Sequence, residues 1–107
     1  MAAIDVADCT VTQSSPNAGL TEVWFQTLAT ADASDTLALT LKDYGISDTG
    51  LLAVQSWVHT TTNSVITTEA NTTAVSSGVL TVTIAAGTNN DVRVIRVVGR
   101  AIPNVTA

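Results

Sequence analysis

The stretch Val79-Leu-Thr-Val-Thr-Ile84 decides the fold class, because aliphatic and threonine side chains alternate along it. Successive side chains of a β-strand point to opposite faces of a sheet, so we expect Leu80, Val82 and Ile84 to share a buried face. The threonines between them are expected to face solvent, as in an antiparallel sheet with one wet side. The segment Thr36-Leu-Ala-Leu-Thr-Leu-Lys42 repeats the pattern. Both segments therefore predict β structure with one buried face.

A third predicted strand, over residues 21–28, alternates less cleanly. Val23 and Phe25 share one face, whereas Trp24 lies on the other face with Glu22. Large aromatic residues on a polar face are either core fillers or binding anchors. Trp24 is therefore a candidate contact residue or saccharide platform, with Glu22 beside it.

The longest predicted strand is Leu51-Leu-Ala-Val-Gln-Ser-Trp-Val-His-Thr60, which has apolar residues on both faces. Period-two alternation places Leu52, Val54 and Val58 together and Trp57 on the opposite face. A strand that is apolar on both faces belongs in the middle of a sheet or beneath a partner. Trp57 is interpreted as a core residue.

Turn-forming clusters rich in Gly, Ser, Asn and Asp separate these strands at regular spacing. This spacing predicts an all-β fold, an antiparallel β-sandwich of jelly-roll-like or Ig-like type with little or no helix. The part from Leu51 onward is expected to form an antiparallel meander. We expect one β domain over residues 1–107, with an extended N-terminal segment (about 1–18) and a C-terminal tail (about 101–107).

Composition and charge argue against several classes of partner. The formal net charge is −5, with four basic residues, which disfavours nucleic-acid binding and an anionic membrane surface. The longest aliphatic run, Leu51–Val54, is far shorter than the ~20 residues that span a bilayer. The single cysteine, Cys9, excludes an intrachain disulfide. The acidic N-terminus also lacks the features of a signal peptide.

Three of the four basic residues, Arg93, Arg96 and Arg100, fall in the apolar run 91–100. Alternation places Arg96 and Arg100 on one face with Val92, Val94 and Val98, and Arg93 on the other with Ile95, Val97 and Gly99. Because arginine is enriched at interfaces, we expect these residues to meet carboxylates of a neighbouring subunit. Candidate partner carboxylates are Glu22, Glu69 and Asp91. The alternative is an edge strand whose arginines block aggregation.

Catalytic and metal-binding signatures are missing from the sequence. It contains no Gly-x-Ser-x-Gly elbow, phosphate-binding glycine loop, His-Glu-x-x-His or Cys-x-x-Cys. We therefore predict no catalytic residue, metal site or cofactor, and no enzyme. The acidic pairs Asp32 with Asp35 and Asp43 with Asp48 are interpreted as turn caps, with weak calcium binding as the minor alternative.

Three segments carry a resemblance to a known class of proteins: Trp57-Val-His-Thr-Thr-Thr-Asn-Ser-Val65, the Ser-Ser-Gly hairpin within 72–83, and the closing arginine-containing strand. Together they resemble small virion structural proteins of tailed bacteriophages, of the capsid decoration, cement or head-fibre type. The resemblance implies a non-enzymatic protein, made in the host cytoplasm, that binds the major capsid protein on the virion surface. It also implies self-association, with a homotrimer favoured. The alternative is a carbohydrate-binding or adhesion module that uses Trp24 or Trp57.

Overall fold

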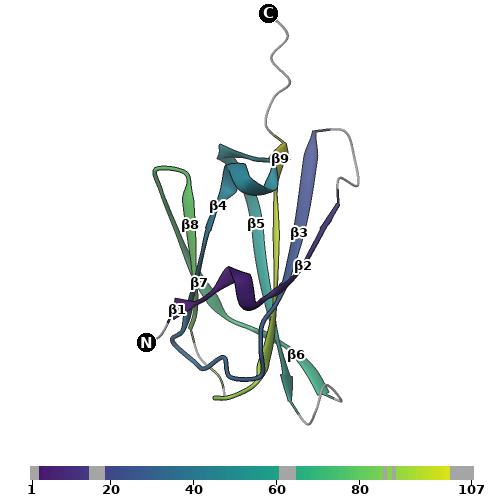
Figure 1. Cartoon of the computed structure of the whole chain (residues 1–107), viewed down its shortest axis with the longest axis vertical. Helices are drawn as coiled ribbons and strands as arrows, with labels where there is room; N and C mark the ends of the chain where they lie inside the picture. Colours follow the sequence, from purple (N-terminus) through teal and green to yellow (C-terminus); the bar gives the residue numbers. More distant parts are fainter. Residues whose placement is uncertain (1–2, 15–18, 61–64, 86, 88, 102–107) are drawn as a thin grey trace, which may run out of the picture.

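The computed structural model describes residues 3–14, 19–60, 65–85, 87 and 89–101. These residues form two β-sheets that pack face to face (Figure 1). The four-stranded sheet has the order β1 (Ala3–Ile4), β4 (Thr36–Thr40), β8 (Val79–Ile84), β7 (Asn71–Ser76). The five-stranded sheet has the order β2 (Thr10–Ser14), β3 (Leu20–Gln26), β9 (Val92–Ala101), β5 (Ile46–Thr60), β6 (Val65–Glu69).

The predicted all-β sandwich is confirmed. Neighbouring strands are antiparallel except for the short pair β1 and β4, which is parallel. Within the described ranges the helical structure is limited to two 3₁₀ turns, η1 (Val6–Asp8) and η2 (Leu41–Tyr44). Gly45 ends the second turn in a left-handed conformation.

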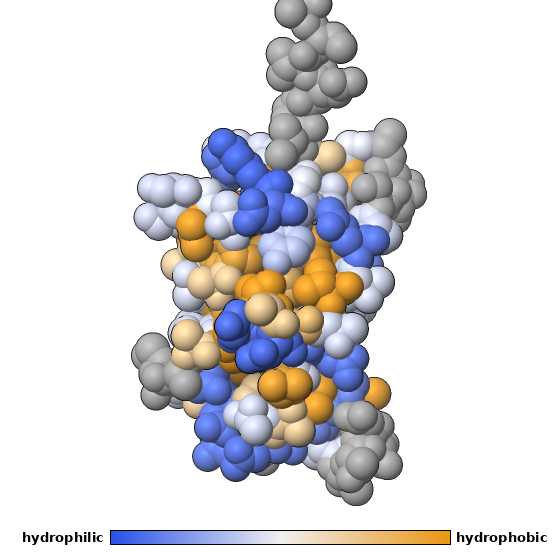
Figure 2. Space-filling model, in the orientation of Figure 1, coloured by the Kyte–Doolittle hydropathy of each residue, from blue (hydrophilic) through white to orange (hydrophobic). Residues whose placement is uncertain are grey.

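The core follows the predicted alternation of β4 and β8. Leu80 and Val82 are fully buried, and the antiparallel register sets them beside Leu39 and Leu37. The five-stranded sheet covers this layer with Val23, Phe25, Ile95 and Val97. Each such side chain contributes about 1.5–3 kcal/mol by leaving water. On the side that carries β1, η1 and β2, hydrophobic residues remain visible between hydrophilic patches (Figure 2).

The position of β9 corrects two predictions. After β8 the chain crosses to the other sheet, where β9 pairs with both β3 and β5 instead of closing a meander. Val97 illustrates this central position, because it is paired with Val23 on one side and Val54 on the other. A strand that is hydrogen-bonded on both sides has no free edge, so its arginines cannot protect one. The edge-protection interpretation is therefore wrong.

A β-bulge in β5 corrects the predicted face of Leu52. The pairs Leu51↔Gly99 and Ala53↔Val98 leave Leu52 as an extra residue. Leu51 consequently packs against the core while Leu52 is exposed, and the predicted alternation resumes at Val54. The neighbouring strand approaches closely here: a Cβ atom at position 99 would lie 2.4 Å from Ile46 Cγ2.

The N-terminal segment contributes a strand to each sheet, β1 and β2, with η1 between them. Asp5 caps η1 by accepting a hydrogen bond from the backbone N–H of Ala7 at 2.9 Å. The predicted C-terminal tail lies outside the described residues beyond Ala101. In the described residues, the outer faces of both sheets and the edge strands lie at the surface.

Candidate binding surface on the five-stranded sheet

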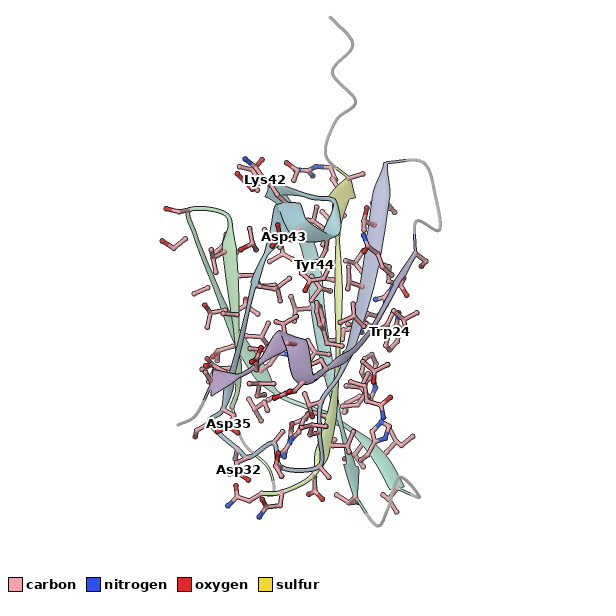
Figure 3. All side chains as sticks on the ribbon, viewed as in Figure 1. Trp24, Asp32, Asp35, Lys42, Asp43 and Tyr44 are labelled. Carbon is pink, nitrogen blue, oxygen red and sulfur yellow. The ribbon has the colours of Figure 1, made fainter. Side chains whose placement is uncertain are left out.

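Two tryptophans stack on the outer face of the five-stranded sheet. The rings of Trp24, from β3, and Trp57, from β5, have centroids 5.3 Å apart and an interplanar angle of 14°. They meet over β9, whose Val94 is paired with Trp57 and whose Arg96 is paired with Trp24. In Figure 3, Trp24 lies on the side of β3 away from the four-stranded sheet. The tryptophan pair therefore lies outside the core.

The prediction of Trp57 as a core residue is wrong. Its neighbours Ser56 and Val58 are buried between the sheets, and alternation sends Trp57 outward. Trp57 is half-buried, because the stack with Trp24 covers part of its ring. Alternation in the sequence groups Trp57 with the other residues on its side of the strand. It does not show which of the two sides meets the core.

Arg96 joins the tryptophan pair to a carboxylate. Its Nη2 lies 2.9 Å from Glu22 Oε2, its Nη1 donates to Gln55 Oε1 at 2.8 Å, and its Cζ lies 5.7 Å from the Trp24 ring centroid. The indole N–H of Trp24 donates to Glu22 Oε1. The hydrogen bond from Arg96, and secondarily that from Trp24, lowers the pKa of the Glu22 carboxyl.

These contacts define a pre-organised surface, which we call the tryptophan–arginine face: Glu22, Trp24, Gln55, Trp57, Val94 and Arg96. Its side chains hold one another in place before any partner arrives, which reduces the conformational entropy lost on binding. Tryptophan and arginine are also the residue types that most often dominate binding energy at protein interfaces. A shallow depression beside Trp24 is bordered by Thr10, Thr12, Gln26 and Val94.

Arg93 lies inside the sandwich, which corrects its predicted place at a subunit interface. Its side chain is fully buried, and Nε and Nη2 each lie 3.1 Å from a carboxylate oxygen of Glu69. Its Nη1 also donates to the backbone carbonyl of Ala31. Alternation groups Arg93 with Ile95 and Val97, and this face of β9 is the core face. The guanidinium is therefore matched by a carboxylate of its own chain.

Of the five residues predicted at an interface, Trp24, Glu22 and Arg96 come together and Arg93 does not. Arg100 is exposed near the end of β9, where its Nη2 donates to the backbone carbonyl of Thr49 at 3.2 Å. Gln55 was not predicted from sequence as a member of the face, and Trp57 was named only for the alternative carbohydrate-binding or adhesion function. Their two-residue spacing along β5 was the available signal, because it places both on one side of the strand.

Of the two acidic pairs, Asp32 and Asp35 act as local caps. Asp35 Oδ2 accepts the backbone N–H of Asp32, and Asp32 Oδ1 accepts that of Asn90. These two aspartates lie at one end of the sandwich, and Asp43 and Lys42 lie at the other (Figure 3). Asp48 pairs with Lys42 at 3.5 Å. The described residues contain no group of three or more His, Cys, Asp and Glu side chains placed to hold a metal ion.

Comparison of the chain with family models, curated proteins and solved structures finds no match of any of the three kinds. Within the described residues, no helix has the length and apolar character needed to cross a membrane.

Proposed function

We propose that this chain is a non-enzymatic structural protein of a virus particle, which self-associates and binds the major capsid protein as a decoration or cement protein. The observation that carries the proposal is the tryptophan–arginine face, a pre-organised surface in which a tryptophan stack adjoins an Arg96–Glu22 ion pair. The sequence resemblance to small phage virion proteins supports the major capsid protein as the proposed partner.

The shape of the surface favours a protein partner over a small ligand. Small-molecule sites are usually concave and enclose most of their ligand. Here the side chains project from the outer face of a sheet, and the depression beside Trp24 is shallow. Aromatic residues and arginine at the centre, with polar residues such as Gln26 and Gln55 around them, match the composition of protein interfaces.

Self-association would strengthen binding to a capsid. A capsid presents many equivalent sites, so an oligomer that engages several of them gains avidity without new contacts at each site. A small subunit benefits most, because one face of a single sheet buries a limited area. The proposed oligomer therefore converts a modest contact into stable decoration.

The test is binding of the purified chain to capsids assembled from the major capsid protein of the same genome. Wild type is expected to co-sediment with capsids at saturable occupancy. Trp57→Ala is expected to weaken binding about thirtyfold, because truncation of an interface hot spot costs about 2 kcal/mol or more. Thr81→Ala, on the outer face of the other sheet, is the matched control and should bind like wild type. Absence of wild-type binding, or equal binding by all three proteins, would refute the proposal.

A carbohydrate-binding or adhesion function is the second candidate, and the outward-facing tryptophan pair is the observation that favours it. The indole rings offer a large apolar surface with polar groups beside it. Stacking of Trp24 on Trp57 occupies one face of each ring, which reduces the area available to a sugar. Saturable quenching of tryptophan fluorescence by a glycan, together with no affinity for capsids, would reverse the order of the two candidates.

A further inference from the structure

The outer face of the five-stranded sheet carries most of the chain's exposed positive charge. Alternation along β9 places Arg96 and Arg100 on this face and sends Arg93 into the core. Lys42, the fourth basic residue, lies in η2. Two of the four cations therefore share one face, where Glu22 is the one acidic side chain among the described residues.

The remaining surface of the chain is acidic. The formal net charge is −5, and most aspartates belong to the 3₁₀ turns and the loops between strands. Asp48, the aspartate within β5, pairs with Lys42 and lies beside Gly78 in the hairpin of the other sheet. The outer face of the five-stranded sheet is thus a local region of positive charge on an acidic molecule, and such a region attracts negatively charged groups.

Arg100 carries a charge that the described part of its own chain does not balance. Its side chain is exposed, and Nη2 donates to the neutral backbone carbonyl of Thr49. No carboxylate of the described residues pairs with Arg100, whereas Arg96 is paired with Glu22. A carboxylate from a partner would complement this guanidinium, because arginine binds carboxylates through two parallel hydrogen bonds.

The tryptophan–arginine face offers a partner hydrogen-bond donors more than acceptors. Both carboxylate oxygens of Glu22 accept hydrogen bonds within the face, from Trp24 and Arg96, and the side-chain oxygen of Gln55 accepts another from Arg96. The side-chain NH₂ of Gln55, the Nε–H of Arg96 and the indole N–H of Trp57 donate to none of the described residues. Internal bonding therefore engages the acceptors and leaves these donors for a partner.

The spacing of the two outward arginines indicates the shape of the partner segment. Arg96 and Arg100 are four residues apart on a stretch of β9 that pairs with β3 without a break, so their Cα atoms lie about 13 Å apart. Side chains four residues apart on an extended segment have the same spacing and direction. Val98 lies between the arginines and is half-buried. An extended segment with an apolar residue midway between two acceptor side chains therefore matches this part of the face.

We infer that this face binds an extended acidic segment of the proposed capsid partner, with a carboxylate against Arg100 and hydrogen-bond acceptors against Arg96, Gln55 and Trp57. The inference rests on the proposed function, and it names the chemistry that the partner presents. Because the chain is acidic elsewhere, its other surfaces repel the same segment. The arginines thus select the face that docks.

The direct test is NMR titration of the full chain with a capped probe peptide, acetyl-Glu-Thr-Val-Thr-Glu-amide, and with its Gln-Thr-Val-Thr-Gln counterpart. The acidic peptide is expected to give saturable shifts at the side-chain N–H signals of Trp57, Gln55, Arg96 and Arg100. The uncharged peptide should bind about fivefold more weakly, the effect of a partly exposed ion pair. Equal binding of the two peptides, or no shift at these signals, would overturn the inference.

Substitutions on the face test the same contact. Arg100→Gln should weaken binding of the acidic peptide about fivefold, and Arg100→Lys should weaken it less because lysine keeps the charge. Gln55→Glu keeps an oxygen that accepts from Arg96, but it replaces the free donors with a second acceptor and a negative charge. It should therefore weaken binding at least about tenfold.

Lys42→Gln and Thr81→Glu are the matched controls for charge removed and charge added. Lys42 is the exposed cation outside the face, and Thr81 lies on the outer face of the other sheet. Both variants should bind the acidic peptide like wild type, and circular dichroism should show the wild-type β-sheet signal in every variant. Controls that weaken binding as much as Arg100→Gln and Gln55→Glu would show that net charge alone is responsible, and the inference would be wrong.

Co-sedimentation with capsids separates this inference from the proposed function. Loss of binding in Trp57→Ala, with Arg100→Gln binding like wild type, would leave the capsid function in place and overturn the acidic partner. Selective binding of the acidic peptide by a wild type that ignores capsids would refute the proposed function while supporting the acidic specificity of the face. If Arg100→Gln dissociates an oligomer of the chain without changing capsid occupancy, the occupant is a second copy and the inference is overturned.

Discussion

The Arg93 guanidinium and the Glu69 carboxylate form a two-pronged ion pair inside the sandwich, with two N–O distances of 3.1 Å. The pair joins the start of the central strand β9 to the last residue of the edge strand β6. The neighbouring hydrogen bond from Arg93 to the Ala31 carbonyl ties the loop after β3 to the same point. One arginine therefore connects three segments that are distant in sequence.

Removing the carboxylate of this pair should be strongly destabilising. Glu69→Ala leaves the buried Arg93 charge without its partner, so we expect a loss of about 3–5 kcal/mol in the free energy of unfolding. Urea denaturation followed by circular dichroism measures this loss. Lys42→Ala breaks the exposed pair with Asp48 and should cost less than about 1 kcal/mol, because solvent screens such pairs.

The double variant Arg93→Met with Glu69→Leu separates charge from packing. It removes both buried charges while keeping apolar volume, and its stability should exceed that of Glu69→Ala. If Glu69→Ala unfolds at the same urea concentration as wild type, the Arg93–Glu69 ion pair does not stabilise the fold.

A methyl group at position 99 should also destabilise the fold. The Cβ of Gly99→Ala would lie 2.4 Å from Ile46 Cγ2 and 3.0 Å from the Gly50 carbonyl oxygen. Overpacking of this kind costs about 1–3 kcal/mol of the free energy of unfolding. In a double-mutant cycle with Ile46→Ala, which removes Cγ2, the loss of stability in the double variant should be smaller than the sum of the two single losses. Strict additivity would show that the contact with Ile46 is not the cause.

The Glu22 carboxyl should titrate below its ordinary pKa of about 4.3. The Arg96–Glu22 contact then stabilises the fold above that ordinary pKa, and its contribution is lost as the pH falls through the lowered pKa of the folded state. NMR titration of the side-chain carboxyl measures this value directly. Arg96→Gln should raise the pKa of Glu22 more than Trp24→Phe does, since the Arg96 hydrogen bond is the larger cause. An unchanged Glu22 pKa in Arg96→Gln would contradict the geometry of the face.

Cys9 should be a slow thiol. Burial, followed by the negative charges of Asp8 and Asp5, raises the pKa of its thiol above the ordinary value of about 8.5. Less thiolate is then present at neutral pH, so reaction with a disulfide reagent should be slower than that of a free cysteine. Asp8→Asn should accelerate the reaction at a given pH. A wild-type rate equal to that of the free amino acid would show that Cys9 is neither buried nor influenced by these carboxylates.

Period-two alternation predicted those features that depend on neighbouring residues in the chain. Leu80 and Val82 share a buried face because side chains two apart on a strand point the same way, whatever the strand pairs with. The same rule placed Arg93 with Ile95 and Val97, and Trp24 with Glu22. Each of these groupings is present in the structure.

The predictions that failed were those that depended on which strands pair and in what register. The predicted meander would place β9 beside β8, whereas the structure inserts it between β3 and β5. This central position makes the Arg93 face the core face and brings Glu69 within reach. The bulge opposite Gly99, which turns Leu52 outward, likewise depends on the register between two strands.

The amino-acid sequence by itself determined the β class and, apart from the bulge at Leu52, which residues share a strand face. These properties follow from local geometry and composition, which act over one or two residues. Only the tertiary structure decided that Arg93 is buried and that Arg96 joins Trp24 and Trp57 at the surface. The reason is physical: strand order and register are selected by burial summed over segments far apart in the chain, and no single segment contains that information.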